Sequence, residues 1–466
     1  MTLRVYDTLS RRKSAFKTIE DGKVRMYVCG PTVYDSAHIG HAMSALVFDV
    51  VRRYLIYLGY NVLYVMNFTD VDDKIIARAE QLDVPPISLA EKYIDEFKKD
   101  LADLNILPAT VHPRATEEID AIIDMVARLL ENDAAYEVDG DVYFRVKKDK
   151  DYGKLSGRNL EEMNAGARIR VDERKENPMD FAIWKAAKSG EPAWESPWGP
   201  GRPGWHIECS AMNLSHLGQQ IDIHGGGNDL IFPHHENEIA QTEAITGKQF
   251  SRYWMHNGML QLKGIAMSKS KGNMISIRNF LKAHPADVMR LIVISSHYRS
   301  PLTYMDEVAE ANERAFNRLL SAKRPAMPGA EGAAAAVLER LSEQTETTHQ
   351  GFIEAMDDDF NTAGALGQIF DLVRAINLAR SENATDAELS PAQKVFNELT
   401  GVLGLDLKPD ESAATQADAF IDLLLELRQE LRQQKHFSLA DRIRDELVSL
   451  GVVIEDTPQG STWRWE

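Results

Sequence analysis

The sequence is short of cysteine, of long apolar runs and of positive charge. Its two cysteines, Cys29 and Cys209, are too few for a disulfide framework in 466 residues, which favours a reducing compartment. Without a long apolar run, and with no apolar signal core at its N-terminus, the chain is expected to be cytoplasmic and to make no membrane contact. Its 53 Lys and Arg against 71 Asp and Glu leave a net charge of −18, which argues against non-specific binding to nucleic acid.

The composition is otherwise that of a globular protein, with 44% hydrophobic and 27% charged residues, and the length suggests two to four domains. The charge is unevenly distributed, because residues 251–300 hold eight basic residues against one acid, Asp287. A solvated basic face or a bound polyanion would explain this excess, and we favour the polyanion. The basic residues are Arg252, Lys263, Lys269, Lys271, Arg278, Lys282, Arg290 and Arg299.

The most informative stretch surrounds two histidines, His38 and His41. An apolar run at 24–28 predicts a buried strand, Gly30 breaks it, and a long apolar helix is expected from Gly40. A helix start exposes unpaired N–H groups and the positive end of the dipole, so it favours a phosphate. Two imidazoles there could donate hydrogen bonds to a phosphoryl group as its negative charge increases. Gly40 leaves room for a phosphate or a flat ring to approach the backbone. One capping and one packed histidine is the alternative interpretation.

Residues 24–70 are predicted to form a strand, a helix and a second strand over 61–68. Both strands are too apolar to have a solvated face, which indicates a βαβ unit of a doubly wound, parallel, Rossmann-like sheet in an α/β fold. Ligands of such sheets bind beyond the carboxyl ends of the strands. Cys29, Gly30 and Thr69 fall at those ends, together with the two histidines.

The patterns predict four regions. Residues 1–250 form the Rossmann-like domain with an insertion at about 75–200, followed by a connecting region at 251–306, a helical bundle at 307–405 and a small α+β unit at 406–466. One expected helix runs from a capping box at Ser88 and Glu91 to about residue 104, one begins at residue 205, and one has Pro233 in its first turn. A basic helix is expected to reach about residue 450. The other expected helices lie at 116–131, 307–323, 335–356, 361–381 and 390–403. The remaining expectations are a strand at 140–146, an irregular loop at 191–204, a strand at 220–224 before a glycine loop, strands flanking a loop at 268–273, and a C-terminal hairpin.

A metal site is suggested by His234 and Glu238, which lie four residues apart on a predicted helix and so share a face. His235 is three residues from Glu238 and is also possible, although we prefer His234. With Cys29 and Cys209 they make a Cys₂-His-Glu set that suits tetrahedral zinc. A buried thiol, a capping histidine and a surface carboxylate are the ordinary alternatives.

The chain resembles the class I aminoacyl-tRNA synthetases, and most closely the cysteinyl-tRNA synthetase family, over essentially its whole length. The H-I-G-H of residues 38–41 matches the first class I signature, and the A-M-S-K-S of 266–270 matches the last four positions of the second, with Ala266 in place of its first lysine. The family resemblance rests on C-G-P-T-V-Y-D at 29–35, W-H-I-E-C-S-A-M at 205–212, H-G-G-G-N-D-L-I-F-P-H-H-E-N-E at 224–238, H-Y-R-S-P-L at 297–302, D-D-D-F-N-T at 357–362 and the C-terminal L-A-D-R-I-R-D-E-L and G-S-T-W-R.

The resemblance implies that the chain activates L-cysteine with ATP and Mg²⁺ and transfers it to tRNA(Cys), with the bundle and C-terminal unit holding the tRNA. It implies one zinc ion on Cys29, Cys209, His234 and Glu238. It also implies His38, His41 and Lys269 as catalytic residues, in a nucleotide site made of Gly30, His38, Gly40, His41, Ser268, Lys269 and Ser270. Lys263 or Lys271 could replace the signature lysine missing at Ala266.

A substrate thiol can bind zinc, whereas serine offers only a hydroxyl, so the metal would select cysteine without an editing domain. Trp205 could wall the pocket, and Thr69 is a further candidate for it. Asp229 and His224 are candidates for the substrate's amine and carboxylate, with scaffolding and capping as their alternative roles. We expect a monomer.

Two other functions compete with this one. A mycothiol-pathway ligase would join cysteine to an amino sugar through the same adenylate, and a zinc-dependent RNA-binding protein would have no catalysis. The helical bundle and the basic residues of 428–444 favour tRNA, and the intact His38, His41 and Lys269 favour an enzyme. The basic residues in question are Arg428, Arg432, Lys435, Arg442 and Arg444.

Overall fold

The computed structural model describes residues 2–159, 174–262, 265–266, 274–408, 412–457 and 460–465. The chain divides into two compact units, Met1–Asp406 and Leu407–Glu466. None of the helices in the described part of the chain combines the length and apolarity needed to cross a membrane.

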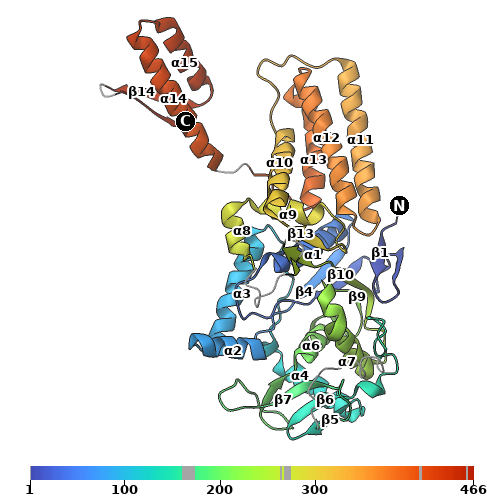
Figure 1. Ribbon diagram of the computed structural model, residues 1–466. Helices are drawn as coiled ribbons and strands as arrows, with labels where there is room; N and C mark the ends of the chain where they lie inside the picture. The colour runs from blue at the N-terminus through green and yellow to red at the C-terminus, as the bar shows by residue number, and fades with distance from the viewer. Residues whose placement is uncertain are drawn as a thin grey trace. The chain divides into compact units, whose positions relative to one another are not determined.

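The centre of the first unit is a parallel four-stranded sheet of order β10-β9-β3-β4 (Figure 1). The helix α1 (Ile39–Tyr57) connects β3 to β4, which confirms the predicted βαβ unit and the Rossmann-like α/β class. The four strands are β3 (Lys23–Val28), β4 (Asn61–Met66), β9 (Ile221–Gly227) and β10 (Ser251–Asn257). A hairpin of β1 (Arg4–Asp7) and β2 (Arg12–Ala15) precedes them.

Helices cover the sheet because its strands are apolar on both faces. The helix α1 packs against β4 and β9, and α6 (Trp205–Leu217) packs against β3 and β4. The fully buried ring of Phe48 on α1 lies so close to Gly225 that a Cβ there would stand 2.4 Å from it. On the α6 side, Tyr27, Met212 and Trp254 belong to one buried cluster.

The predicted glycine loop at residues 225–227 is wrong, because these glycines are the last residues of β9. Their missing side chains let neighbouring rings pack directly on the strand. Pro233 lies in a π-helical turn (Ile231–His235) that leads directly into α7 (Glu236–Thr246), and Phe232 before the proline is extended.

The insertion between β4 and α6 contains helices and a separate antiparallel sheet of order β5-β6-β7-β8. Its elements are α2 (Asp73–Leu82), α3 (Pro86–Asp103), a 3₁₀ turn (Ala115–Glu117), α4 (Ile119–Glu131), β5 (Ala135–Val138), β6 (Asp141–Phe144), β7 (Phe181–Ala186) and β8 (Gly201–Pro203). The predicted capping box at Ser88 is wrong, because α3 starts at Pro86 and Ser88 lies inside it. The loop predicted over 191–204 ends in β8, which pairs with β7.

Three short strands follow the central sheet, namely β11 (Leu260–Leu262), β12 (Ile265–Ala266) and β13 (Leu302–Tyr304). The strands predicted to flank the 268–273 loop are partly wrong, because β11 and β12 both precede that loop and α8 (Ile277–Ala283) follows it. The loop itself lies outside the described residues. A further helix, α9 (Ala286–Ile294), leads towards the bundle.

The bundle consists of α10 (Asp306–Ala322), α11 (Ala335–Asp357), α12 (Thr362–Ser381) and α13 (Asp386–Val402), which stand side by side at one end of the unit (Figure 1). Helix α13 begins four residues before its predicted start because Thr385 and Glu388 form a capping box.

The basic segment 251–300 is partly used inside the fold. Arg290 is fully buried, pairs with Asp49 at 2.7 Å and donates to the carbonyl of Leu403 at the end of the bundle. Arg278 pairs with Asp100 at 2.5 Å, and Arg299 pairs with Asp359 at 3.0 Å. The polyanion interpretation is therefore wrong for Arg290, which has no access to a ligand.

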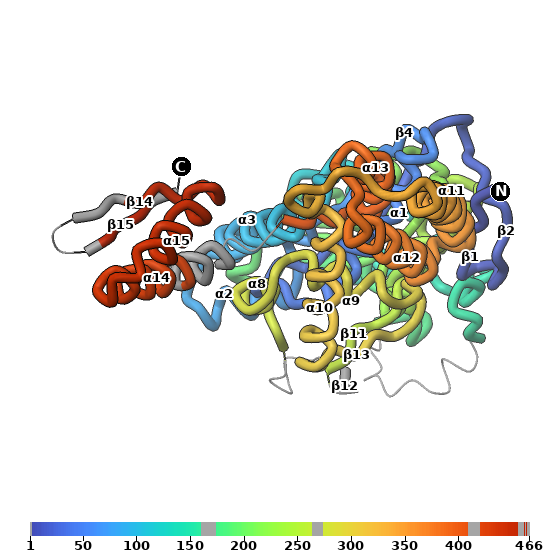
Figure 2. Tube along the Cα trace, turned by 90° about the horizontal axis from the view of Figure 1, so that it is seen from above, coloured from blue at the N-terminus to red at the C-terminus, as the bar shows by residue number. Residues whose placement is uncertain are grey.

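The second unit pairs α14 (Ser412–Gln433) and α15 (Phe437–Ser449) with a hairpin of β14 (Val452–Thr457) and β15 (Gly460–Trp465) (Figure 2). The hairpin confirms its prediction, but the single basic helix is wrong, because the chain turns between the two helices at Lys435, whose φ is 61°. Arg428 is buried and donates to Ser461 Oγ at 2.9 Å. Its charge is thus not available to a partner, whereas Arg432, Arg442 and Arg444 are exposed.

Candidate active site and metal centre

A cavity of about 370 Å³ opens at the carboxyl ends of the central strands, beside the start of α1. This is where ligands of doubly wound sheets bind. It brings together ten of the residues singled out in the sequence: Cys29, Gly30, His38, Gly40, His41, Thr69, Trp205, Cys209, Asp229 and His234. Glu238 and His224 do not line it and are fully buried. Ser268, Lys269 and Ser270 lie outside the described residues.

The two signature histidines cap α1 reciprocally. His38 Nδ1 accepts from the Gly40 N–H at 3.1 Å, and His41 Nδ1 accepts from the His38 N–H at 3.3 Å. Their rings are stacked with centroids 3.9 Å apart. A neutral imidazole that accepts at Nδ1 carries its proton on Nε2. Both histidines therefore combine the capping role with a place in the cavity wall, so the two interpretations made from the sequence are not exclusive.

The residues that follow the second signature are hydrogen-bonded to residues in and next to the first signature. The Ile39 N–H donates to the carbonyl of Ile275 at 3.0 Å, and the Ile277 N–H donates to the carbonyl of Ala37 at 3.0 Å. Leu260, in β11 before the signature, lines the cavity. Both flanks of the second signature thus lie beside the helix start that carries the first.

Gly30 is needed where β3 leaves the sheet. A Cβ at this position would stand 1.6 Å from the carbonyl oxygen of Asn67, so only glycine permits this approach of the two chain segments. The Asn67 side chain accepts from the Gly30 N–H at 2.9 Å and lies 3.7 Å from Cys209 Sγ. This contact fixes the backbone next to Cys29.

Four potential metal ligands meet at the base of the cavity. Cys29 Sγ lies 3.6 Å from Cys209 Sγ, 3.5 Å from His234 Nε2 and 3.3 Å from Glu238 Oε1, and His234 Nε2 lies 3.0 Å from Glu238 Oε1. Zinc bonds of about 2.3 Å to sulfur and about 2.1 Å to nitrogen or oxygen imply tetrahedral edges of roughly 3.3–3.8 Å. The three separations that involve Cys29 fall in this range, the His234–Glu238 separation of 3.0 Å is slightly shorter, and all four donor atoms lie within 4.8 Å of one another, so they surround a space suited to a zinc ion.

The electrostatics of this cluster also fit a cation. Burial raises the pKa of Glu238 well above its usual range, although a hydrogen bond with Cys29 opposes the shift. Burial likewise raises the pKa of Cys29 and lowers that of His234. The ion-pair partners of Glu238 among the described residues are three histidines, and no Lys or Arg of the described chain pairs with it. A buried carboxylate and two thiols without a lysine or arginine partner among the described residues are donors that a divalent metal would compensate.

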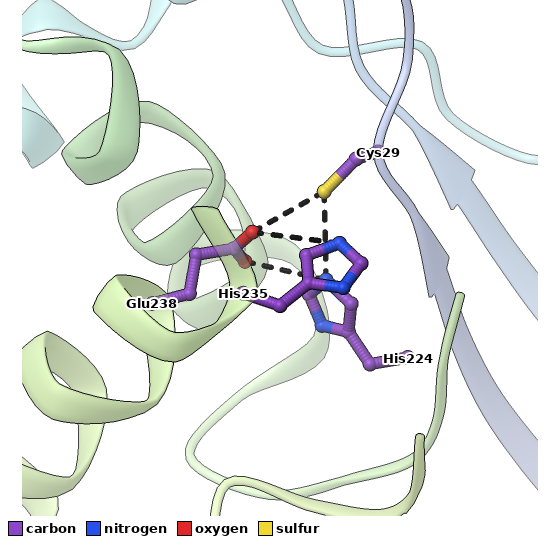
Figure 3. A group of neighbouring side chains, drawn as sticks. All are labelled: Cys29, His224, His235 and Glu238. Carbon is purple, nitrogen blue, oxygen red and sulfur yellow. Dashed lines mark hydrogen bonds and ion pairs between the residues drawn. The ribbon is translucent and has the colours of Figure 1, made fainter. Parts of the chain in front are cut away.

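Cys29 and Glu238 also lie close to two further histidines, His224 and His235 (Figure 3). His224 Nε2 lies 3.5 Å from Cys29 Sγ and 3.3 Å from Glu238 Oε2. Both histidines are fully buried and neither lines the cavity, whereas His234 does. A metal that must reach a ligand in the cavity is thus better served by His234, whose Nε2 is also nearer to Glu238 Oε1 than that of His235, at 3.0 against 3.9 Å.

His234 is oriented by its neighbours. Its Nδ1 lies 3.0 Å from His206 Nδ1, which leaves Nε2 directed at the sulfur and carboxylate donors. Its ring stacks on Trp205 with centroids 4.3 Å apart. Partners of this kind hold a ligating imidazole in one orientation. His206 was not singled out from the sequence, although it lies beside Trp205 in the same motif.

The structure separates the four candidates for the substrate pocket. Trp205 and Thr69 line the cavity, and Thr69 Oγ1 donates to the buried Glu208 at 2.9 Å. Asp229 lines it from the 3₁₀ turn Asn228–Leu230 that follows β9. His224 instead stacks on Trp254 behind the metal-ligand cluster, with centroids 4.4 Å apart, so its position does not favour a contact with the substrate.

Sequence reasoning missed Lys74, which lines the cavity from the first turn of α2. The insertion is predicted to begin at about residue 75, next to Lys74, and no site residue is predicted within it. Lys74 follows β4 by eight residues, so its place beyond the carboxyl end of a parallel strand was the signal that could have found it.

The fold and the site together define a class I aminoacyl-tRNA synthetase, and solved structures share the fold. A Mycobacterium tuberculosis methionyl-tRNA synthetase in complex with methionyl-adenylate matches with a TM-score of 0.60 and 17% identity, over 82% of this chain and 89% of that one. An Agrobacterium radiobacter LeuRS in a ternary complex matches with a TM-score of 0.59 and 11% identity, over 84% of this chain and 87% of that one. The family model for the tRNA synthetases class I (C) catalytic domain matches residues 15–314.

The chain belongs to the cysteinyl-tRNA synthetase family. A cysteine–tRNA ligase of Heliobacterium modesticaldum is 51% identical over 480 residues and covers 100% of both chains. One of Thermococcus onnurineus is 50% identical, over 100% of this chain and 99% of the relative. A DALR domain model matches residues 351–408, and a cysteinyl-tRNA ligase anticodon binding domain model matches 416–464.

Proposed function

We propose that this cysteine–tRNA ligase selects its amino acid with a zinc ion held by Cys29, Cys209, His234 and Glu238. The observation that carries the proposal is that these donors, drawn from three distant segments, converge at the base of the cavity within 4.8 Å of one another. When bound, zinc supplies a Lewis acid with affinity for thiolate sulfur. A site built around such a contact rejects analogues that lack it by roughly 10⁴–10⁵, so serine would be excluded at the first step.

The first step joins the cysteine carboxylate to the α-phosphorus of ATP and expels pyrophosphate. Negative charge is spread over phosphoryl oxygens during the step, so catalysis depends on positioning and on preorganised donors. We infer that His38 and His41 direct Nε2–H donors at these oxygens, because the reciprocal cap uses Nδ1 of both rings. Lys269 is proposed to close over the pyrophosphate, and Mg²⁺ accompanies ATP.

In the second step a hydroxyl of the terminal adenosine of tRNA(Cys) attacks the adenylate, and AMP leaves. No protein nucleophile is needed. We propose that the bundle at 307–405 contacts the tRNA and that the unit at 406–466 reaches its anticodon, with the catalytic domain at 1–250 and the connecting region at 251–306. The match of 416–464 to an anticodon binding domain supports this assignment, as do the exposed Arg432, Arg442 and Arg444.

The two competing functions are not favoured. An amino-sugar ligase does not require an anticodon-binding unit, and the chain matches a cysteine–tRNA ligase over the full length of both proteins. A binding protein without catalysis has no use for two histidines that combine a helix cap with a cavity wall. The cytoplasmic location and the monomeric state stay predictions.

Truncation after Lys408 should separate amino-acid activation from tRNA charging, because the first compact unit ends at Asp406. We expect ATP–pyrophosphate exchange with cysteine to stay within about threefold of the full chain, with serine still rejected. Charging of tRNA(Cys) should fall by roughly 10²-fold or more, because base contacts contribute about 1–3 kcal/mol each. Equal losses in exchange and charging would contradict the proposed division of labour.

A further inference from the structure

The wall of the cavity carries very little charge. Among the described residues that line it, Lys74 is the only lysine or arginine, and Asp229 is the only carboxylate. The ammonium of Lys74 acts on Asp229, whose pKa burial raises and Lys74 lowers. The cavity thus presents one positive and one negative group outside the cluster of metal ligands.

Lys74 is held in place by its neighbours on α2. The side chain of Asp72 caps the helix by accepting from the Lys74 N–H at 2.9 Å. Asp73 pairs with Lys185 at 2.6 Å and also with Arg202, which ties the start of α2 to the sheet of the insertion. The Lys74 ammonium lies 5.8 Å from the centre of the Tyr34 ring, and it forms no ion pair with a described residue. The start of α2 is therefore fixed in place, and the Lys74 side chain lines the cavity.

The substrate needs such a pair of charges. Cysteine at neutral pH has a thiol, an ammonium and a carboxylate, and the proposed function places the thiol at the metal ligands. Asp229 suits the ammonium by charge, and the acceptor oxygen of Thr69 lies in the same wall. The carboxylate then needs a cation, and His224 lies outside the cavity. The only lysine or arginine among the described residues of the cavity wall that could bind this carboxylate is Lys74.

We propose that Lys74 binds the α-carboxylate of the amino acid and, with Asp229, recognises the zwitterion. This rests on the proposed function and assigns the polar end of the same substrate. One carboxylate oxygen faces the ammonium, and the other attacks the α-phosphorus of ATP. The P–O bond to pyrophosphate breaks, and pyrophosphate leaves with its electron pair. Lys74 keeps its proton throughout, so it positions the nucleophile without transferring a proton.

The test compares cysteine with cysteamine, which has the same thiol and amine but no carboxylate. Lys74→Met should raise the KM for cysteine in ATP–pyrophosphate exchange by roughly 10- to 100-fold, the worth of a charged hydrogen bond. The inhibition constant of cysteamine should change by less than about twofold, because cysteamine never made the contact. Lys74→Arg should recover most of the cysteine affinity.

A matched control is available in Lys92→Met. Lys92 is also exposed and lies 5.2 Å from the centre of a tyrosine ring, that of Tyr93, but it does not line the cavity. This variant should bind cysteine normally.

An unchanged KM for cysteine in Lys74→Met, or an equal loss of affinity for cysteamine, would overturn the proposal. So would a loss confined to the KM for ATP or to transfer onto tRNA, either of which would assign Lys74 to a phosphate. Failure of cysteamine to inhibit the wild-type chain would instead count against the proposed metal site.

Discussion

Cys209→Ser is expected to remove zinc and cysteine activation together. Cys209 Sγ is one corner of the proposed ligand set, 3.6 Å from Cys29 Sγ, and a hydroxyl is a much poorer zinc ligand than a thiolate. The zinc content of the purified protein should fall to near zero. Cysteine-dependent ATP–pyrophosphate exchange should fall by roughly 10³-fold, as when a contact made in the transition state is lost. The melting temperature should also drop, because metal binding contributes to folding.

Met212→Leu is the matched control, because Met212 is equally buried one turn along α6 and is not among the proposed ligands. A volume-conserving change of this kind costs less than about 1.5 kcal/mol, and zinc content and exchange should both be normal. If Cys209→Ser kept its zinc, or kept its exchange activity after metal loss, the assignment of Cys209 would fail.

His38→Asn is expected to lower the rate of adenylate formation while leaving the fold intact. Asparagine is a good N-cap and can accept from the Gly40 N–H through its side-chain oxygen, as His38 Nδ1 does at 3.1 Å. It cannot reproduce the imidazole Nε2–H donor. We expect kcat for exchange to fall by roughly 10²-fold, the usual cost of one preorganised donor. The KM for cysteine should change little, because the proposed ligand set is not altered.

His38→Ala separates the two roles. It removes both the cap and the donor, so it should lose the same catalytic rate and also about 1 kcal/mol of stability. Thermal denaturation of the three proteins measures the cap, and exchange kinetics measure the donor. A His38→Asn variant with full activity would show that the histidine acts only as a cap.

The centre of the fold could be predicted because its signals are local. The apolar strands at 24–28 and 61–68 and the helix between them form the βαβ unit of β3, α1 and β4, and the carboxyl-end rule placed Cys29 and Thr69 at the cavity. The spacing of His234 and Glu238 also predicted neighbouring side chains. Their contact joins the π-helical turn Ile231–His235 to the first turn of α7, at the predicted separation of four residues.

Features that depend on tertiary contacts could not be read from the sequence. Glycines normally end a strand, but Gly225 continues β9 because Phe48 occupies the space of its missing side chain. The charge pattern could not distinguish exposed arginines from the buried Arg290, whose partner Asp49 is 241 residues away. Likewise His224 stands next to a glycine run that suggested a pocket, yet packing against Trp254 places it behind the ligands.

X-ray absorption at the zinc edge of the purified protein, with and without L-cysteine, tests most directly whether a metal recognises the substrate's sulfur. Cys29 and Cys209 predict two sulfur ligands per zinc in the free protein, and saturating cysteine should raise the number to three while serine leaves it at two. Zinc surrounded by the same two sulfurs in the presence of cysteine, in protein that still forms the adenylate, would contradict the proposed selection of the thiol.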